Sequence, residues 1–243
     1  MFFEKGNPKL YESLYQRPPT GDELKLAIDF INSDDESIEL VRAPSQWSYG
    51  YGEFDSATGR VATFTLLPHF SGTAWQGGDS YPDTKLGWLQ LSSTGGHPGN
   101  NLKHAIVRRW TATLNGSYAI HSKISHEPEV GDGIRAFVSH GTRGLLRSAT
   151  LFHSAEQIDV DTIAIIKGDT LDFTVDIRDG LNSDQFLWSP KITLTGTTGA
   201  GGDTVNQIFD AEKDFARESK SHLDRWQQLA QVLMLANEFM FVD

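Results

Sequence analysis

The residues best suited to bind a ligand are aromatic, imidazole and amide side chains in or beside glycine-rich turns. A flat aromatic face stacks on the apolar C–H face of a sugar ring, and a polar side chain fixes the ring's hydroxyl groups. Trp75 lies in GTAWQGG and His97 in TGGHPGNN, two stretches whose composition is typical of loops. We predict a carbohydrate-binding surface formed by Trp47, Tyr49, Trp75, His97 and Asn100.

The TGGHPGNN stretch also has a structural interpretation, which is the favoured one. Paired glycines permit positive φ and close backbone approach, and Pro98 stiffens the chain. The stretch would then form a corner, with His97 bonded to a nearby backbone carbonyl. In a binding loop the imidazole would instead be partly exposed, next to Trp75 or an acidic side chain.

Acidic side chains in two turn sequences, EVGDGIR and DIRDGLNSDQF, indicate a calcium site. Calcium takes about six to eight oxygen ligands, and oxygen side chains two or three positions apart around Gly180 suit it. We predict a structural calcium ion with Asp179, Asn182 and Asp184 as ligands. The alternative is that these residues occur here because aspartate and asparagine favour turns.

Catalytic motifs are absent from the sequence. It contains no nucleophile elbow G-x-S-x-G, no phosphate-binding loop and no H-E-x-x-H zinc motif. Glycoside hydrolysis needs two carboxyl groups across a cleft, but 32 acidic residues offer too many pairs to single one out. A non-catalytic binding module is therefore the preferred function. A structural or docking domain without a small ligand and a polysaccharide-active hydrolase stay as alternatives.

The elements that must position these residues are strands. Short segments rich in β-branched and aromatic residues follow one another through the middle of the chain, without a helical pattern between them. Two of them, AIVRRWTATL and SYAIHSKIS, are joined by Asn115-Gly116, a dipeptide typical of a hairpin. The pattern predicts a mainly β fold, an antiparallel β-sandwich of the jelly-roll type. Trp88 and Trp110 lie inside such segments and are predicted to be core residues.

Helical signals are confined to the two ends of the chain. Thr20-Gly21-Asp22-Glu23 has the form of a capping box, and apolar residues follow it at helical spacing. Near the other end, Trp226, Leu229 and Leu233 fall on one face of a second helix.

Neither end carries enough apolar surface to be stable alone. Residues 1–42 and 205–243 are therefore predicted to pack together as the end of a larger helical domain, with a β-sandwich of residues 43–204 inserted between them. The Gly/Thr-rich run TGTTGAGGDT would be the linker back to the last helix. Apolar surface left uncovered on these helices would favour self-association.

The composition excludes several classes of partner. The formal net charge of -11 repels phosphate backbones, so we expect no nucleic acid partner. With no cysteine, the chain has no disulfide, thiolate metal site, cysteine nucleophile or covalently attached haem. No apolar run is long enough to span a membrane, and the first residues do not form a signal peptide.

Several longer motifs carry a resemblance to a known family. They are WSYGYGEFD, LPHFSGTAWQGG, LGWLQLSSTGGHPGN, AIVRRWTA, EVGDGIRA, NSDQFLWSP and WQQLAQVLMLANEFMFVD. Together they resemble the C-terminal region of planctomycete-type secreted proteins, which combine a cytochrome c domain with domains of unknown function. The resemblance implies an exported, multidomain protein with a carbohydrate-binding-like jelly roll inserted in its last domain. The haem motif Cys-x-x-Cys-His of that family is missing here.

Overall fold

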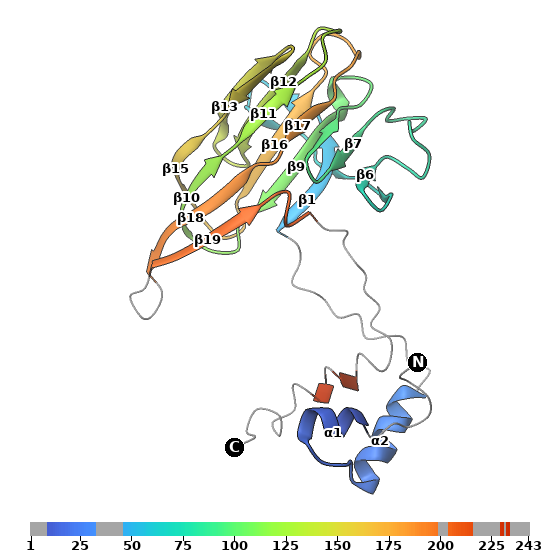
Figure 1. Ribbon diagram of the computed structural model, residues 1–243. Helices are drawn as coiled ribbons and strands as arrows, with labels where there is room; N and C mark the ends of the chain where they lie inside the picture. The colour runs from blue at the N-terminus through green and yellow to red at the C-terminus, as the bar shows by residue number, and fades with distance from the viewer. Residues whose placement is uncertain (1–8, 33–45, 199–203, 216–228, 231, 234–243) are drawn as a thin grey trace. The chain divides into compact units, whose positions relative to one another are not determined.

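The computed structural model describes residues 9–32, 46–198, 204–215, 229–230 and 232–233 (Figure 1). The chain divides into two compact units, one formed by residues 1–44 together with 218–243 and the other by residues 45–217. The β-rich unit is thus inserted into the helical one. In the described part of the chain, no helix is both long and apolar enough to cross a membrane.

The helical unit is built from both ends of the chain. It contains α1 (Lys9–Tyr15) and α2 (Gly21–Ile31), and Thr20 and Glu23 form the capping box at the start of α2. The guanidinium of Arg17 bonds both carboxylate oxygens of Glu23, at 2.8 and 2.9 Å, and with the amide of Thr20 it lowers the pKa of Glu23 to about 2. Side chains from residues far apart in the sequence form its core: Tyr11, Tyr15, Ala27, Leu229 and Leu233.

The first layer of the sandwich is a six-stranded sheet in which every pairing is antiparallel. In spatial order its strands are β13 (Gly144–Leu151), β12 (Ile134–His140), β16 (Thr170–Asp176), β9 (Ala105–Thr111), β1 (Trp47–Gly52) and β4 (Thr65–Leu66). A small hairpin of β2 (Phe54–Asp55) and β3 (Arg60–Val61) lies between β1 and β4 in the sequence.

The second layer contains two sheets. The first has the order β15 (Val160–Ile165), β10 (Gly116–His121), β18 (Lys191–Thr198) and β19 (Thr204–Asp210). The second has the order β14 (Ser154–Gln157), β11 (Lys123–His126), β17 (Phe186–Trp188), β8 (Gly95–His97), β7 (Gln90–Ser92), β6 (Ala74–Gln76) and β5 (His69–Phe70).

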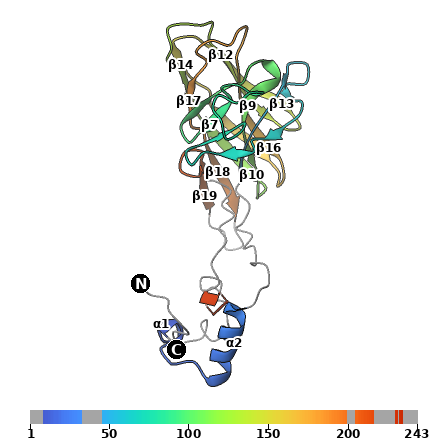
Figure 2. The ribbon, with the colours of Figure 1, turned by 90° about the vertical axis from the view of Figure 1, so that its right-hand side faces the viewer.

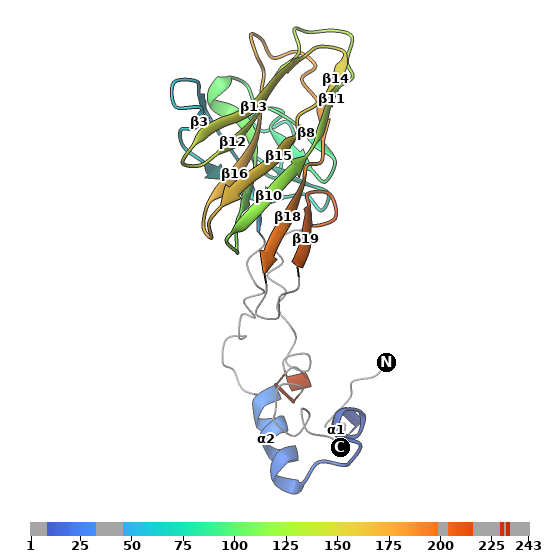
Figure 3. The same cartoon turned by 90° about the vertical axis from the view of Figure 1, so that its left-hand side faces the viewer.

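Strands continue from one sheet of the second layer into the other. Only Ser122 separates β10 from β11, and the two strands run in line in Figure 3. Ser122 is bonded to the segment just before β15: its Oγ donates to the Ile158 carbonyl and its N–H donates to the Asp159 side chain, both at 2.8 Å. The second layer is therefore one bent surface packed on the six-stranded sheet.

The core between the layers is aromatic at its centre. Trp110 of β9 is fully buried, as predicted, and its ring meets Tyr118 of β10 at 5.2 Å and Phe209 of β19 at 5.1 Å. These contacts join strands from both layers.

Two predictions about connections are wrong. Residues 204–210 are not helical: they form β19, which pairs with β18, so the sheet region extends beyond residue 204 and the Gly/Thr-rich run is not a linker to a helix. Asn115-Gly116 does not close a hairpin either, because β9 pairs with β1 and β16 while β10 pairs with β15 and β18. The buried rings of Trp110 and Tyr118 place β9 and β10 in opposite layers.

Candidate functional site

Two of the predicted ligand-binding aromatics lie in the core. Trp47 and Tyr49 of β1 are 2% and 5% exposed, so neither offers a face to a ligand. Their positions follow from the pairing of β1, because they alternate with outward-facing Ser48 on a strand at the interior of the six-stranded sheet.

Trp75 is half-buried and packs partly against the core. On β6 it lies opposite the buried Leu91, and its ring stacks on Tyr49 with centroids 6.0 Å apart and an interplanar angle of 16°. The ring of Phe70 also contacts Trp75, with centroids 5.3 Å apart. GTAWQGG is thus not a loop throughout: it contains the short strand β6, which packs the indole partly against the core and leaves it half-buried.

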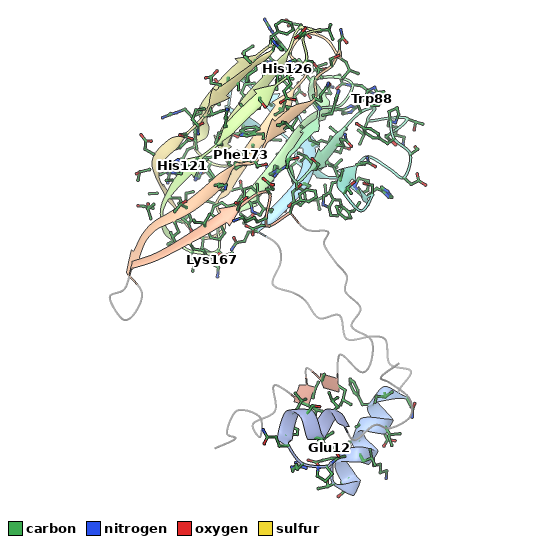
Figure 4. The ribbon with its side chains drawn as sticks, in the orientation of Figure 1. Glu12, Trp88, His121, His126, Lys167 and Phe173 are labelled. Carbon is green, nitrogen blue, oxygen red and sulfur yellow. The ribbon has the colours of Figure 1, made fainter. Side chains whose placement is uncertain are left out.

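Trp88 is exposed on the surface, although the sequence analysis assigned it to the core. Its exposed fraction is 46%, whereas the next residue, Leu89, is fully buried. The alternation in WLQL could have predicted this exposure: Leu89 and Leu91 face the core, so Trp88, one position before Leu89, must face away from it. Figure 4 shows Trp88 at the side of the sandwich that carries β7.

Tyr81 packs beside Trp88 on the same surface. Its ring meets Trp88 edge to face at 5.4 Å and 85°, and its hydroxyl donates to the Trp88 carbonyl at 3.1 Å. Burial raises the pKa of the Tyr81 phenol to about 12, so the hydroxyl keeps its proton at neutral pH. A hydroxyl that donates to a carbonyl still has lone pairs with which to accept a hydrogen bond.

His97, at the end of β8, is the third member. Its ring centroid lies 6.4 Å from that of Trp88, and its Nδ1 is 2.7 Å from the Pro98 carbonyl. Because a carbonyl oxygen only accepts, Nδ1 carries the proton and Nε2 is left as an acceptor. Burial lowers the pKa of His97, which favours this neutral form. His97 thus has features of both the structural and the binding interpretation: it is bonded to a backbone carbonyl, and it is half-buried beside the exposed ring of Trp88.

A tight turn holds the loop that carries Tyr81 and Trp88. Asp83 and Gly87 exchange backbone hydrogen bonds of 2.8 and 2.9 Å, and Asp83 Oδ1 accepts from the amides of Leu86 and Lys85. Those amides lower the pKa of Asp83. Figures 1 and 2 show that the segment carrying β6 and β7 lies along one side of the sandwich.

Asn100 fixes this turn from outside. Its Nδ2 donates to the Lys85 carbonyl at 3.1 Å, and a Cβ on Gly87 would lie 1.7 Å from its Oδ1. Gly87 also has φ of +66°, so this position needs glycine for both reasons. We call Tyr81, Trp88, His97 and Asn100 the Trp88 site. Of the five predicted ligand-binding residues, the structure brings only His97 and Asn100 to it.

The predicted calcium ligands do not form a set of converging oxygens. The side chain of Asp179 is 80% exposed and lies 3.5 Å from Arg178, whereas Asp184 is fully buried and accepts from the Asn182 amide. Burial raises the pKa of Asp184 to about 6, and the carboxylates of Asp132 and Asp176 add to this effect. Within the described ranges, no group of three acidic or histidine side chains is arranged to hold a metal ion.

Comparisons with known proteins give similarity to β-domains of several kinds. A family 35 carbohydrate-binding module from an environmental isolate is 15% identical, with 61% of this chain and 93% of the module covered and a TM-score of 0.28. The PA14 sugar-binding domain of an RTX adhesin is 10% identical, with 44% and 52% covered and a TM-score of 0.26. Pika GITRL is 15% identical, with 37% and 75% covered and a TM-score of 0.28. No protein-family model and no curated protein matches the chain. These similarities assign no ligand, so the function is argued from the Trp88 site itself.

Proposed function

We propose that the β-sandwich is a non-catalytic carbohydrate-binding module and that the Trp88 site is its binding surface. The observation that carries the proposal is Trp88 itself, a large aromatic ring 46% exposed and braced edge to face by Tyr81. Exposing such a ring forgoes the stabilisation of burial, and rigid aromatic side chains are the usual anchors of binding surfaces.

The polar groups around the ring match the hydroxyls of a sugar. His97 Nε2 accepts, the Tyr81 hydroxyl accepts while donating to a carbonyl, and the amide of Asn100 borders the turn. A sugar offers an apolar C–H face to the indole and hydroxyl donors at its rim. The turn is already closed by its own hydrogen bonds, which lowers the entropy cost of binding.

The setting of the module in a larger protein is part of the same proposal. The motif resemblance supports an exported, planctomycete-type multidomain protein, in which the module would bring its neighbours to a polysaccharide. The discontinuous helical unit agrees with such a setting, because the sandwich is inserted in it rather than attached at one end.

The experiment is a glycan array followed by calorimetry on the purified protein and two variants. Trp88→Ala should lower affinity for the bound glycan by about 2 kcal/mol or more, roughly thirtyfold, as expected for an aromatic anchor. Phe152→Ala is the matched control, because Phe152 is also 46% exposed but lies on another loop. Its affinity should be unchanged, and both variants should melt close to the wild type. Binding that survives Trp88→Ala, or the absence of any glycan ligand, would contradict the proposal.

A further inference from the structure

The Trp88 site continues into a row of polar side chains that crosses four strands. The registers place His69 of β5 opposite Gln76 of β6, Gln76 opposite Gln90 of β7, and Gln90 opposite His97 of β8. Directly opposed residues in a sheet point to the same face. We call these four residues the polar row.

The polar row lies on the face of the sheet that is turned away from the core, where His69, Gln90 and His97 are half-buried and Gln76 is buried. On the same strands, Trp75 and Leu91 oppose each other and pack against the core, so residues one position away point in the other direction. Trp88 is two positions before Gln90 and therefore shares its face. The ring contact between Trp88 and His97 joins the aromatic surface to one end of the row.

The middle of the row is held by an amide pair. Gln76 Nε2 donates to Gln90 Oε1 at 3.2 Å. This bond leaves the Gln90 nitrogen as a donor, and Gln76, which is only 8% exposed, holds the Gln90 amide in place. With the imidazoles at its ends, the row offers donors and acceptors but carries no carboxylate, lysine or arginine.

The row is too long for one sugar ring. Neighbouring strands are about 4.8 Å apart, so the three steps from β5 to β8 cover about 14 Å. A ring stacked on Trp88 reaches the His97 end and leaves the half-buried Gln90 and His69 to contact later rings. We infer that the ligand is a neutral, linear oligosaccharide or polysaccharide segment that lies across β5 to β8, with one ring on Trp88. This inference rests on the proposed function, since it specifies the ligand class of the same site.

The test is calorimetry with cello-, xylo-, manno- and chito-oligosaccharides from the monosaccharide to the hexasaccharide, and with oligogalacturonides as acidic chains. Each hydrogen bond to a further ring should raise affinity about fivefold until the row is filled, after which affinity should level off. Neutral chains should bind more tightly than the acidic ones.

The variants separate the row from the aromatic surface. Gln90→Ala and His69→Ala should lower affinity for the longer chains about fivefold each and leave monosaccharide affinity unchanged. Gln90→Glu and His69→Gln keep the side chains' size if the alanine variants melt early. Gln157→Ala, an amide on β14 at the opposite edge of the same sheet, is the matched control.

The outcomes distinguish this inference from the proposed function. Trp88-dependent binding with equal affinity for short and long chains, or with a preference for oligogalacturonides, would overturn the inference and leave the proposed function in place. Absence of Trp88-dependent binding of every saccharide would overturn both.

Discussion

Replacing Arg108 tests how the core of the sandwich supports the proposed binding site. Arg108 lies on β9 and is 2% exposed. Its guanidinium donates to the carbonyls of Ser92 at 2.7 Å, Ser93 at 3.2 Å and Ala211 at 3.1 Å. The chain leaves Ser92 and Ser93 directly for β8, so this fork connects the core to the strand that carries His97.

The expected loss can be worked out for Arg108→Met, which keeps the length of the side chain and removes the charge. Hydrogen bonds to a charged group contribute about 1.5–3 kcal/mol each, and three are lost. Burial lowers the pKa of Arg108 from 12.5 to about 10, which corresponds to about 3 kcal/mol that the uncharged side chain recovers. The net destabilisation should be about 2–6 kcal/mol.

Thermal and urea unfolding of the variant provide the assay. For a domain of this size, that loss should lower the melting temperature by roughly 5–15 °C. Arg147→Met, on the edge strand β13, removes an exposed arginine and should change stability by less than about 0.5 kcal/mol. Hydrogen exchange should also become faster at residues 92–97. If Arg108→Met is as stable as the wild type, the three hydrogen bonds of Arg108 contribute no more than the cost of burying its charge, and this reasoning is refuted.

Further outcomes are expected at two other positions. Gly87→Ala should destabilise the turn by about 1–2 kcal/mol and weaken saccharide binding, because alanine is strained at φ of +66° and its Cβ would meet Asn100. Gly180→Ala is the control: no atom lies within 4 Å of its Cβ, so melting temperature and saccharide affinity should be unchanged. The pKa of Asp184 is raised by burial to about 6, so its favourable contribution is present below about pH 4 and is lost as the pH rises through 6. Asp184→Asn should therefore melt at a higher temperature than the wild type at pH 7, with a weaker pH dependence between 4 and 6; equal melting curves at all pH values would contradict the assignment. Melting in calcium chloride against a chelator tests the predicted calcium ligands in the same pair of proteins, since an ion on Asp184 would stabilise only the wild type.

Local sequence patterns were sufficient for the class of fold. β-Branched and aromatic residues in segments such as AIVRRWT predicted strands, and the capping box predicted the start of α2, because both signals are local in the sequence. The core position of Trp110 was predicted from its place inside such a segment, and the residue is fully buried. Only part of the candidate site was predicted from the sequence. His97 and Asn100 were predicted as ligand-binding residues and belong to it. Trp88 was predicted to be a core residue, although the apolar Leu89 and Leu91 in WLQL place it on the opposite face of the strand.

The partners of each strand were decided by the tertiary structure. Asn115-Gly116 is a good turn sequence, yet it connects two layers instead of closing a hairpin, because Trp110 and Tyr118 are buried against each other between them. The polar row likewise joins His69 to His97 through strands whose register no local pattern contains. A strand's sequence determines which side chains share a face, since that period is local. Which strand lies beside it depends on burying its apolar face against distant segments, and this is settled only when the whole sandwich packs.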